Sequence, residues 1–117
     1  MKMIVAIIRP EKLEAVQHAL NDRDVYLMTV TDVRGCGRQR GFTEVYRGTE
    51  FVVRLLPKLK LEIAVNDAFV EATIEAIVHA SRTPETGQIG DGKIFVLPLD
   101  DCIRIRTGER GSTAIGP

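Results

Sequence analysis

The chain has 117 residues, of which 44% are hydrophobic, and its 16 basic side chains balance 16 acidic ones, as expected for one domain with a modest core. A neutral chain without a basic block is a poor candidate for nucleic-acid binding, because phosphate neutralisation supplies most of that affinity. The two cysteines and two histidines are far apart, so a zinc site is not expected. With no apolar run near the roughly 20 residues that span a bilayer and no signal peptide, we expect a cytoplasmic protein.

The first third of the chain predicts a strand, a helix and a second strand. Residues 3–8 form a short β-rich apolar run. A helix can begin just after Pro10, and apolar side chains follow at helical spacing over 13–20. Residues 28–33 are again β-like.

The second half repeats this order. Residues 59–65 alternate between apolar and polar side chains, as in a strand with one buried face. Asn66 and Asp67 are predicted to cap a helix with an apolar stripe over 70–78, and residues 93–98 form the last strand. Strand, helix, strand, loop, strand, helix, strand predicts an α+β, ferredoxin-like double βαβ fold, an antiparallel sheet with two helices on one face. No remaining element covers the other face, so we expect oligomerisation through it.

A polar, glycine-edged run over 35–51 separates the second and third strands. It is too long for a hairpin turn, and a connection of this length is costly to order and usually functional. A floppy insertion is the alternative. Its four glycines and flanking arginines favour a segment that wraps an anion or docks on a partner.

A second glycine-rich stretch, from Gly87 to Lys93, has the spacing G-x-x-x-x-G-K of a nucleotide P-loop. However, Ile94 replaces the magnesium-binding Ser or Thr, and a strand follows where a P-loop requires a helix, so a coincidental turn is the alternative. Successive glycine amides can still line a phosphate, and Lys93 adds a cation.

Arg104 and Arg106 would project to the same side of an extended segment and suit a polyphosphate, with surface ion pairs as the alternative. Arg38 and Lys60 add cations, and Glu62 could recognise a base or a ribose hydroxyl. No catalytic triad, paired carboxylates or HExxH motif can be identified, so the site is expected to bind rather than to catalyse.

Six ordered segments resemble the PII signal-transduction family, and the match extends over nearly the whole chain. They are MTVT (28–31), G-x-G-R-Q (35–39), G-x-T-E-x-Y-R-G (41–48), LPK (56–58), IGDGKIF (89–95) and RIRTG (104–108). The resemblance implies a single domain (1–117) that assembles as a ferredoxin-like homotrimer, with three clefts between subunits where ATP and ADP compete. It divides the chain into a T-loop (36–55), a B-loop (82–92), a C-loop (104–110) and a flexible tail (111–117).

The resemblance also implies which residues contact ATP or ADP. They are Thr29, Gly35, Gly37, Arg38, Gln39, Glu62, Ala64, Gly90, Asp91, Gly92, Lys93, Arg104 and Arg106. Glu62 and Ala64 would lie near adenine, Thr29 would approach it from the next chain, and both arginines would reach the phosphates from the neighbouring subunit.

Magnesium, held by ATP and Gln39, would complete a 2-oxoglutarate site. That site would consist of Gln39, Arg40, Gly41 and Lys58. The T-loop would then dock on a partner through Tyr46, Arg47 and Thr49, the first candidate being an ammonium transporter and the others further proteins of nitrogen metabolism. Contact with a membrane would occur only through such a transporter.

Several positions depart from the family pattern. Phe51 stands in place of a tyrosine that is uridylylated or adenylylated in some members, and Thr49 in place of a phosphorylated serine. Leu27 replaces a glycine, Gln88 a common lysine, and residues 84–86 form an insertion before the B-loop. Loss of the lysine removes one cation near the phosphates.

These features predict a non-enzymatic sensor of ATP/ADP and 2-oxoglutarate that regulates nitrogen assimilation by docking its T-loop on a target. The alternative is a PII-like nucleotide-binding regulator of another process, such as carbon uptake, that reads a different small molecule. A slow ATPase would require a positioned general base, and none can be identified.

Overall fold

The computed structural model of the chain describes every residue except 37–43, 47–48, 52–54, 85 and 117, and for 44–46 and 49–51 it describes the backbone alone. Its elements, in chain order, are β1 (Lys2–Ile8), η1 (Pro10–Lys12), α1 (Leu13–Asn21), β2 (Thr29–Gly35), β3 (Glu44–Tyr46), β4 (Thr49–Phe51), β5 (Leu56–Val65), η2 (Asp67–Phe69), α2 (Val70–Ser81), β6 (Gly92–Pro98) and α3 (Ser112–Ile115).

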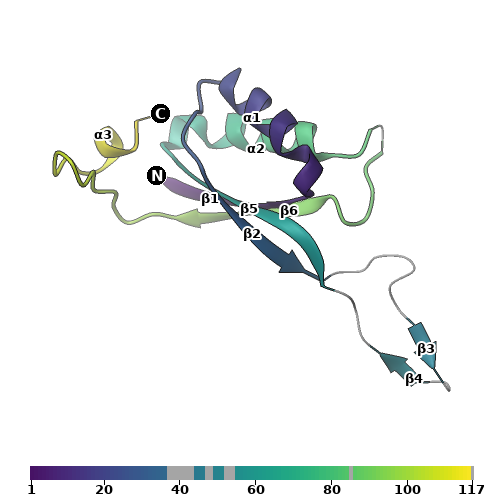
Figure 1. Cartoon of the computed structure of the whole chain (residues 1–117). Coiled ribbons are helices and arrows are strands. Elements are labelled where there is room, and N and C mark those ends of the chain that lie inside the picture. The colour runs from purple at the N-terminus through teal and green to yellow at the C-terminus, as the bar shows by residue number, and fades with distance from the viewer. Residues whose placement is uncertain (37–43, 47–48, 52–54, 85, 117) are drawn as a thin grey trace.

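Four strands form one antiparallel sheet in the order β2-β5-β1-β6, and α1 and α2 lie side by side on one of its faces (Figure 1). The connection through α1 joins β1 to β2 across β5, and the connection through α2 joins β5 to β6 across β1. These are two split βαβ units. The predicted ferredoxin-like α+β fold is therefore confirmed.

The core lies between the sheet and the two helices. Alternate residues of β1 and β5 point to the helices, and Ile4, Ala6, Leu61 and Ile63 have 0% of their surface exposed. The helical stripes expected from sequence meet them, with Val16 and Leu20 on α1 and Ala76 and Ile77 on α2 among the buried residues. The helix-covered face of the sheet is thus buried against α1 and α2.

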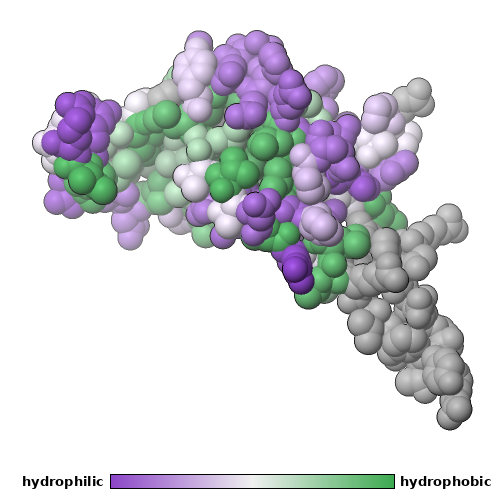
Figure 2. Space-filling model, viewed as in Figure 1, coloured by the Kyte–Doolittle hydropathy of each residue, from purple (hydrophilic) through white to green (hydrophobic). Residues whose placement is uncertain are grey.

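The other face of the sheet carries the alternate side chains, and no helix of the described part of the chain covers it (Figure 1). Val5 lies between Phe95 and Glu62 in register, and Met3 lies between Leu97 and Ala64. Phe95 is 50% exposed and Leu97 45%. Figure 2 shows hydrophilic surface gathered over the outer side of the helices and hydrophobic surface at the level of the sheet.

The predicted cap of the second helix is wrong. Neither Asn66 nor Asp67 makes a side-chain capping hydrogen bond where η2 and α2 begin. Instead, the Asn66 amide donates to the carbonyl oxygens of Ser112 (3.2 Å) and Gly116 (2.9 Å), and the Asp67 carboxylate accepts from the N-terminal amine at 2.8 Å. These two side chains bind both ends of the chain.

The C-terminal segment is more ordered than the sequence predicted. A flexible tail was expected over 111–117, whereas Ser112–Ile115 form α3 and Ile115 is only 5% exposed. Besides Asn66, the Arg104 guanidinium holds this segment by donating to the carbonyl of Thr113 at 3.0 Å. Contacts from the distant Asn66 and from the nearby Arg104 therefore fix a helix that its own sequence does not signal.

Within the long polar run, β3 and β4 pair as an antiparallel two-stranded sheet that lies apart from the main sheet (Figure 1). The sequence predicted only a loop there. None of the helices in the described part of the chain is both long and apolar enough to cross a membrane.

Candidate functional site

A cavity of about 820 Å³, the first cavity, lies where three distant segments meet. They are the end of β2, the beginning of β5 and the loop of residues 82–92. The residues around the cavity are Ile7, Val33, Arg34, Gly35, Cys36, Lys58, Gln88, Ile89, Gly90, Asp91, Gly92, Lys93 and Phe95. Its volume is in the range of ordinary small-molecule sites.

The sheet register brings these segments together. Gly35 at the end of β2 pairs with Leu56 at the start of β5, and Ile8 at the end of β1 pairs with Gly92 at the start of β6. β1 also pairs with β5, with Ile8 opposite Leu59. The end of β2, the beginning of β5 and the loop that leads into β6 therefore meet at one end of the sheet. The 82–92 loop therefore lies beside the base of the long 36–55 segment.

The glycines of the 82–92 loop are required by its backbone. Gly87, Gly90 and Gly92 have φ angles of 77°, 100° and 118°, a region that favours glycine. A Cβ atom on Gly92 would also lie 1.8 Å from the Ile7 carbonyl oxygen. A hydrogen bond of 3.1 Å from the Asp91 amide to the Gln88 carbonyl closes the turn.

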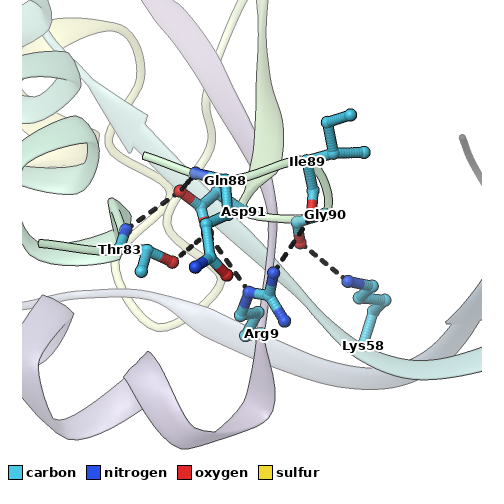
Figure 3. Close-up of polar contacts among 7 residues, drawn as sticks. All are labelled: Arg9, Lys58, Thr83, Gln88, Ile89, Gly90 and Asp91. Atoms are coloured by element: carbon cyan, nitrogen blue, oxygen red, sulfur yellow. Dashed lines mark hydrogen bonds and ion pairs between the residues drawn. The ribbon is translucent and has the colours of Figure 1, made fainter. Parts of the chain in front are cut away.

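Asp91 organises the loop from within (Figure 3). One carboxylate oxygen accepts from the backbone amides of Thr83 (2.9 Å) and Gln88 (2.8 Å), and the other accepts from the Thr83 hydroxyl (2.6 Å) and from Arg9 Nε (3.2 Å). Partial burial alone would raise the pKa of Asp91, but these hydrogen bonds outweigh it and hold that pKa well below its ordinary value. The carboxylate is therefore ionised at neutral pH and fully occupied by the loop.

Two cations hold the carbonyl groups of the same loop (Figure 3). Arg9 donates to the Ile89 carbonyl at 3.1 Å, and Lys58 Nζ donates to the Gly90 carbonyl at 2.8 Å. Burial and the neighbouring Arg9 charge lower the pKa of Lys58, while Glu11 and Asp91 act in the opposite direction. Both cations thus face the loop from the ends of β1 and β5.

The arrangement leaves donors available to an anion. In the described part of the chain, the backbone amides of Ile89 and Gly90 donate to no protein acceptor, and Lys93 makes no ion pair. Free amides beside lysine side chains are a typical phosphate-binding combination. No group of three His, Cys, Asp or Glu side chains that could hold a metal ion occurs among the residues that can be described.

Of the residues predicted to bind nucleotide or 2-oxoglutarate, six line the first cavity. They are Gly35, Lys58, Gly90, Asp91, Gly92 and Lys93. Others lie outside the described residues, namely Gly37, Arg38, Gln39, Arg40 and Gly41. Of the residues predicted to dock on a partner, Arg47 also lies outside them. Tyr46 lies in β3 and Thr49 in β4, and they are partners in the register of that hairpin.

Thr29, Glu62 and Ala64 lie on β2 and β5 but not around the first cavity. Thr29 and Glu62 are partners in register, and Ala64 pairs with Met3 of β1. Lys60, expected as a further cation of the site, lies 3.9 Å from the Glu62 carboxylate. These positions form a separate group on the face of the sheet that no helix covers.

The segment that ends in α3 lies at the opposite end of the molecule from the 82–92 loop (Figure 1). Arg104 donates to the Thr113 carbonyl of α3, and neither Arg104 nor Arg106 lines the first cavity. The extended segment expected here is not observed, and for Arg104 the alternative of a surface ion pair is found. Arg104 pairs with Glu109 at 2.8 Å, and the Gly108 amide bonds the Arg104 carbonyl at 2.7 Å, so the chain turns back. One chain alone therefore does not bring these arginines to the cavity.

Sequence reasoning missed Arg9 and Thr83, which shape the loop. It also missed a second cavity of about 640 Å³ on the helix side of the loop, between α2 and β6. Mostly apolar side chains such as Ile74, Ile77 and Ile94 surround this second cavity, together with Thr86 of the predicted insertion. The described part of the insertion thus contributes to the second cavity rather than the first.

Comparison with known proteins gives consistent matches along the chain. The family model described as nitrogen regulatory protein P-II matches residues 1–109. A nitrogen regulatory protein P-II of Rhodospirillum rubrum is 55% identical over 98% of this chain and 100% of its own length. Nitrogen regulatory protein P-II 2 of Methanothermobacter thermautotrophicus is 56% identical over 98% of this chain and 97% of its own. A nitrogen regulatory protein P-II of Haemophilus influenzae is 53% identical, with 98% and 100% covered.

Proposed function

Because the chain belongs to the nitrogen regulatory protein P-II family, we propose that it is a non-enzymatic signalling protein of nitrogen regulation that senses ATP/ADP and 2-oxoglutarate. The observation that carries this proposal is the first cavity, where the free amides of the 82–92 loop lie beside Lys58 and Lys93. Such a site suits the phosphates of a nucleotide. Among the described residues around the first cavity, Asp91 is the one carboxylate, and it already accepts hydrogen bonds from Thr83, Gln88 and Arg9, which makes it a poor general base.

The proposed nucleotide site is shared between subunits of a homotrimer. Arg104 and Arg106 do not line the first cavity of their own chain, so a neighbouring chain would supply them. The exposed apolar residues of the uncovered sheet face, among them Phe95 and Leu97, offer the surface for that assembly. Glu62 and Ala64, with Thr29 of the next chain, would then meet the adenine.

Magnesium and 2-oxoglutarate complete the proposal. ATP, magnesium and Gln39 would together form the place where the acid binds, and Lys58 would pair with its carboxylate. The long 36–55 segment would respond and dock on a target in the cytoplasm or on an ammonium transporter. Phe51 has no hydroxyl group, so the target cannot be selected by uridylylation at that position.

Titration calorimetry of the pure protein tests this function. We expect ATP and ADP to compete, and 2-oxoglutarate to bind only when ATP and magnesium are both present. By linkage, 2-oxoglutarate should raise the affinity for ATP by the same factor by which ATP raises the affinity for 2-oxoglutarate. This factor corresponds to a coupling free energy of about 1 to 3 kcal/mol. Nucleotide binding without any response to 2-oxoglutarate would instead support a regulator that reads another small molecule. Phosphate release from ATP with turnover would contradict a non-enzymatic role.

A further inference from the structure

Arg9 follows the last residue of β1 and contacts the 82–92 loop at two points. Its guanidinium donates to the carbonyl of Ile89, 80 residues away in sequence, at 3.1 Å, and to the carboxylate of Asp91, 82 residues away, at 3.2 Å. A planar guanidinium with fixed donor directions can hold two acceptors at once, which a lysine ammonium does less well. Arg9 is therefore a clamp across the loop (Figure 3).

The clamp determines where the next amide points. In a trans peptide the C=O of one residue and the N–H of the following residue point in opposite directions. When Arg9 holds the Ile89 carbonyl, the N–H of Gly90 must therefore face away from Arg9. Gly90 lines the first cavity and Arg9 does not, so the amide that points away from Arg9 belongs to a residue of the cavity wall.

Gly90 would not keep this orientation unaided. Its φ angle is 100°, and glycine tolerates both signs of φ, so the peptide between Ile89 and Gly90 can rotate at little cost. A rotated peptide would present a carbonyl oxygen where an anion requires a donor. The Gly90 amide has no protein acceptor in the described part of the chain, so its own bonding does not hold it either.

We propose that Arg9 is a positioning residue for nucleotide phosphates, acting through the Ile89 carbonyl and the Asp91 carboxylate to keep the Gly90 amide available. The inference rests on the proposed nucleotide site. It assigns to Arg9 an effect on phosphates that it does not contact. Groups of a ligand that lie away from the 82–92 loop should therefore not respond to its removal.

The test compares ATP with adenosine in calorimetry of wild-type protein and Arg9→Gln. Arg9→Gln loses a charge-assisted contact that orients a donor, so its affinity for ATP should fall by about tenfold, or 1.4 kcal/mol. Adenosine lacks phosphates, and its affinity should stay within about twofold of wild type. Arg9→Lys keeps the charge but holds one acceptor instead of two, so it should fall between wild type and Arg9→Gln.

Arg23→Gln is the matched control, since it removes the same charge from a side chain that donates to the Ala19 carbonyl at the end of α1. Its ATP affinity should be that of wild type. Equal losses in Arg9→Gln and Arg23→Gln, equal losses of ATP and adenosine, or unchanged ATP binding in Arg9→Gln would each overturn the proposal.

The amide signal of Gly90 in nitrogen-15 NMR spectra separates this proposal from the proposed function. It should shift strongly between nucleotide-free wild type and Arg9→Gln, because the peptide loses its clamp. If wild-type protein binds no ATP, the proposed function fails whatever the spectrum shows. An unmoved Gly90 signal would overturn the positioning role even if wild type binds ATP.

Discussion

Because Gly92 has no side chain, β6 can begin close beside β1. Gly92 has a φ angle of 118°, and a Cβ there would lie 1.8 Å from the Ile7 carbonyl oxygen. That oxygen belongs to the central strand of the sheet and cannot move without disturbing the pairing with β5. Lys93 directly follows Gly92, so the close approach of Gly92 to β1 also positions a cation of the first cavity.

We expect Gly92→Ala to lower the free energy of unfolding by more than about 2 kcal/mol, through the clash and the positive φ angle together. Gly108→Ala is the matched control, because Gly108 has a φ angle of 74° but nothing within 4 Å of its Cβ position. It should cost only about 1 to 2 kcal/mol, the strain of the left-handed region. Urea unfolding at equal protein concentrations measures both, and similar losses would contradict the steric argument.

At the same scale, sequence reasoning identified the residues of the 82–92 loop but not what shapes them. Glycine spacing and Lys93 are local signals, whereas the contact of Arg9 with Asp91 joins residues 82 apart and depends on the register of β1 with β6. Asn66 shows the converse. Its position predicted a helix cap through the side-chain oxygen, but the Nδ2 atom of the same amide donates to two carbonyl groups of the C-terminal segment, and no capping bond forms.

At the scale of elements, periodicity predicted the four strands of the main sheet and both long helices, but it placed some ends wrongly. β5 begins at Leu56 rather than at residue 59. Pro57 argues against a strand, yet it pairs with Arg34 of β2 in a stretch where β1 no longer runs alongside, since the β1 pairing ends at Leu59. Proline is tolerated where one side of a strand is unpaired. Only the sheet order shows that this side is free.

The short helix α3 depends on contacts from elsewhere, because four residues cannot form a stable helix alone. We expect Asn66→Ala to remove two of these contacts and to speed amide hydrogen exchange over 112–116 by about fivefold or more, corresponding to about 1 kcal/mol of lost hydrogen bonding. Asn21→Ala, an exposed change at the end of α1, is the control. Unchanged exchange over 112–116 would show that burial of Ile115 and the hydrogen bonds from Arg104 hold the segment without Asn66.

At the scale of the whole molecule, the residues of the predicted site are divided between opposite ends of the folded chain. The 82–92 loop and the first cavity lie at one end, and the C-terminal segment with α3 lies at the other (Figure 1). Arg106 is exposed, does not line the cavity and makes no ion pair among the described residues. The sequence alone could not show this division, because the separation of Lys93 and Arg106 along the chain says nothing of their distance in space. A cyclic assembly in which each chain contributes both halves to different neighbours would reunite them.

Mixed oligomers test that division directly. We expect Lys93→Glu and Arg106→Glu each to abolish ATP binding as pure proteins, because each puts a negative charge in one half of every shared site. In a mixed ring of three, one site combines the intact cavity of an Arg106→Glu chain with the intact arginine of a Lys93→Glu chain. Refolding the two variants together at equal amounts should therefore restore about a quarter of the wild-type ATP sites, as random mixing requires.

Lys93→Glu mixed with a chain that carries both changes is the negative control, since that mixture contains no intact cavity and should bind no ATP. Light scattering supplies the second measurement, and it should give three times the 13.0 kDa of one chain for every mixture. Trimers that form but regain no ATP binding would show that cavity and arginine do not meet between neighbouring chains. A 13.0 kDa species that binds ATP would place the whole site within one subunit, because only a single chain is then present to supply both the lysine and the arginine.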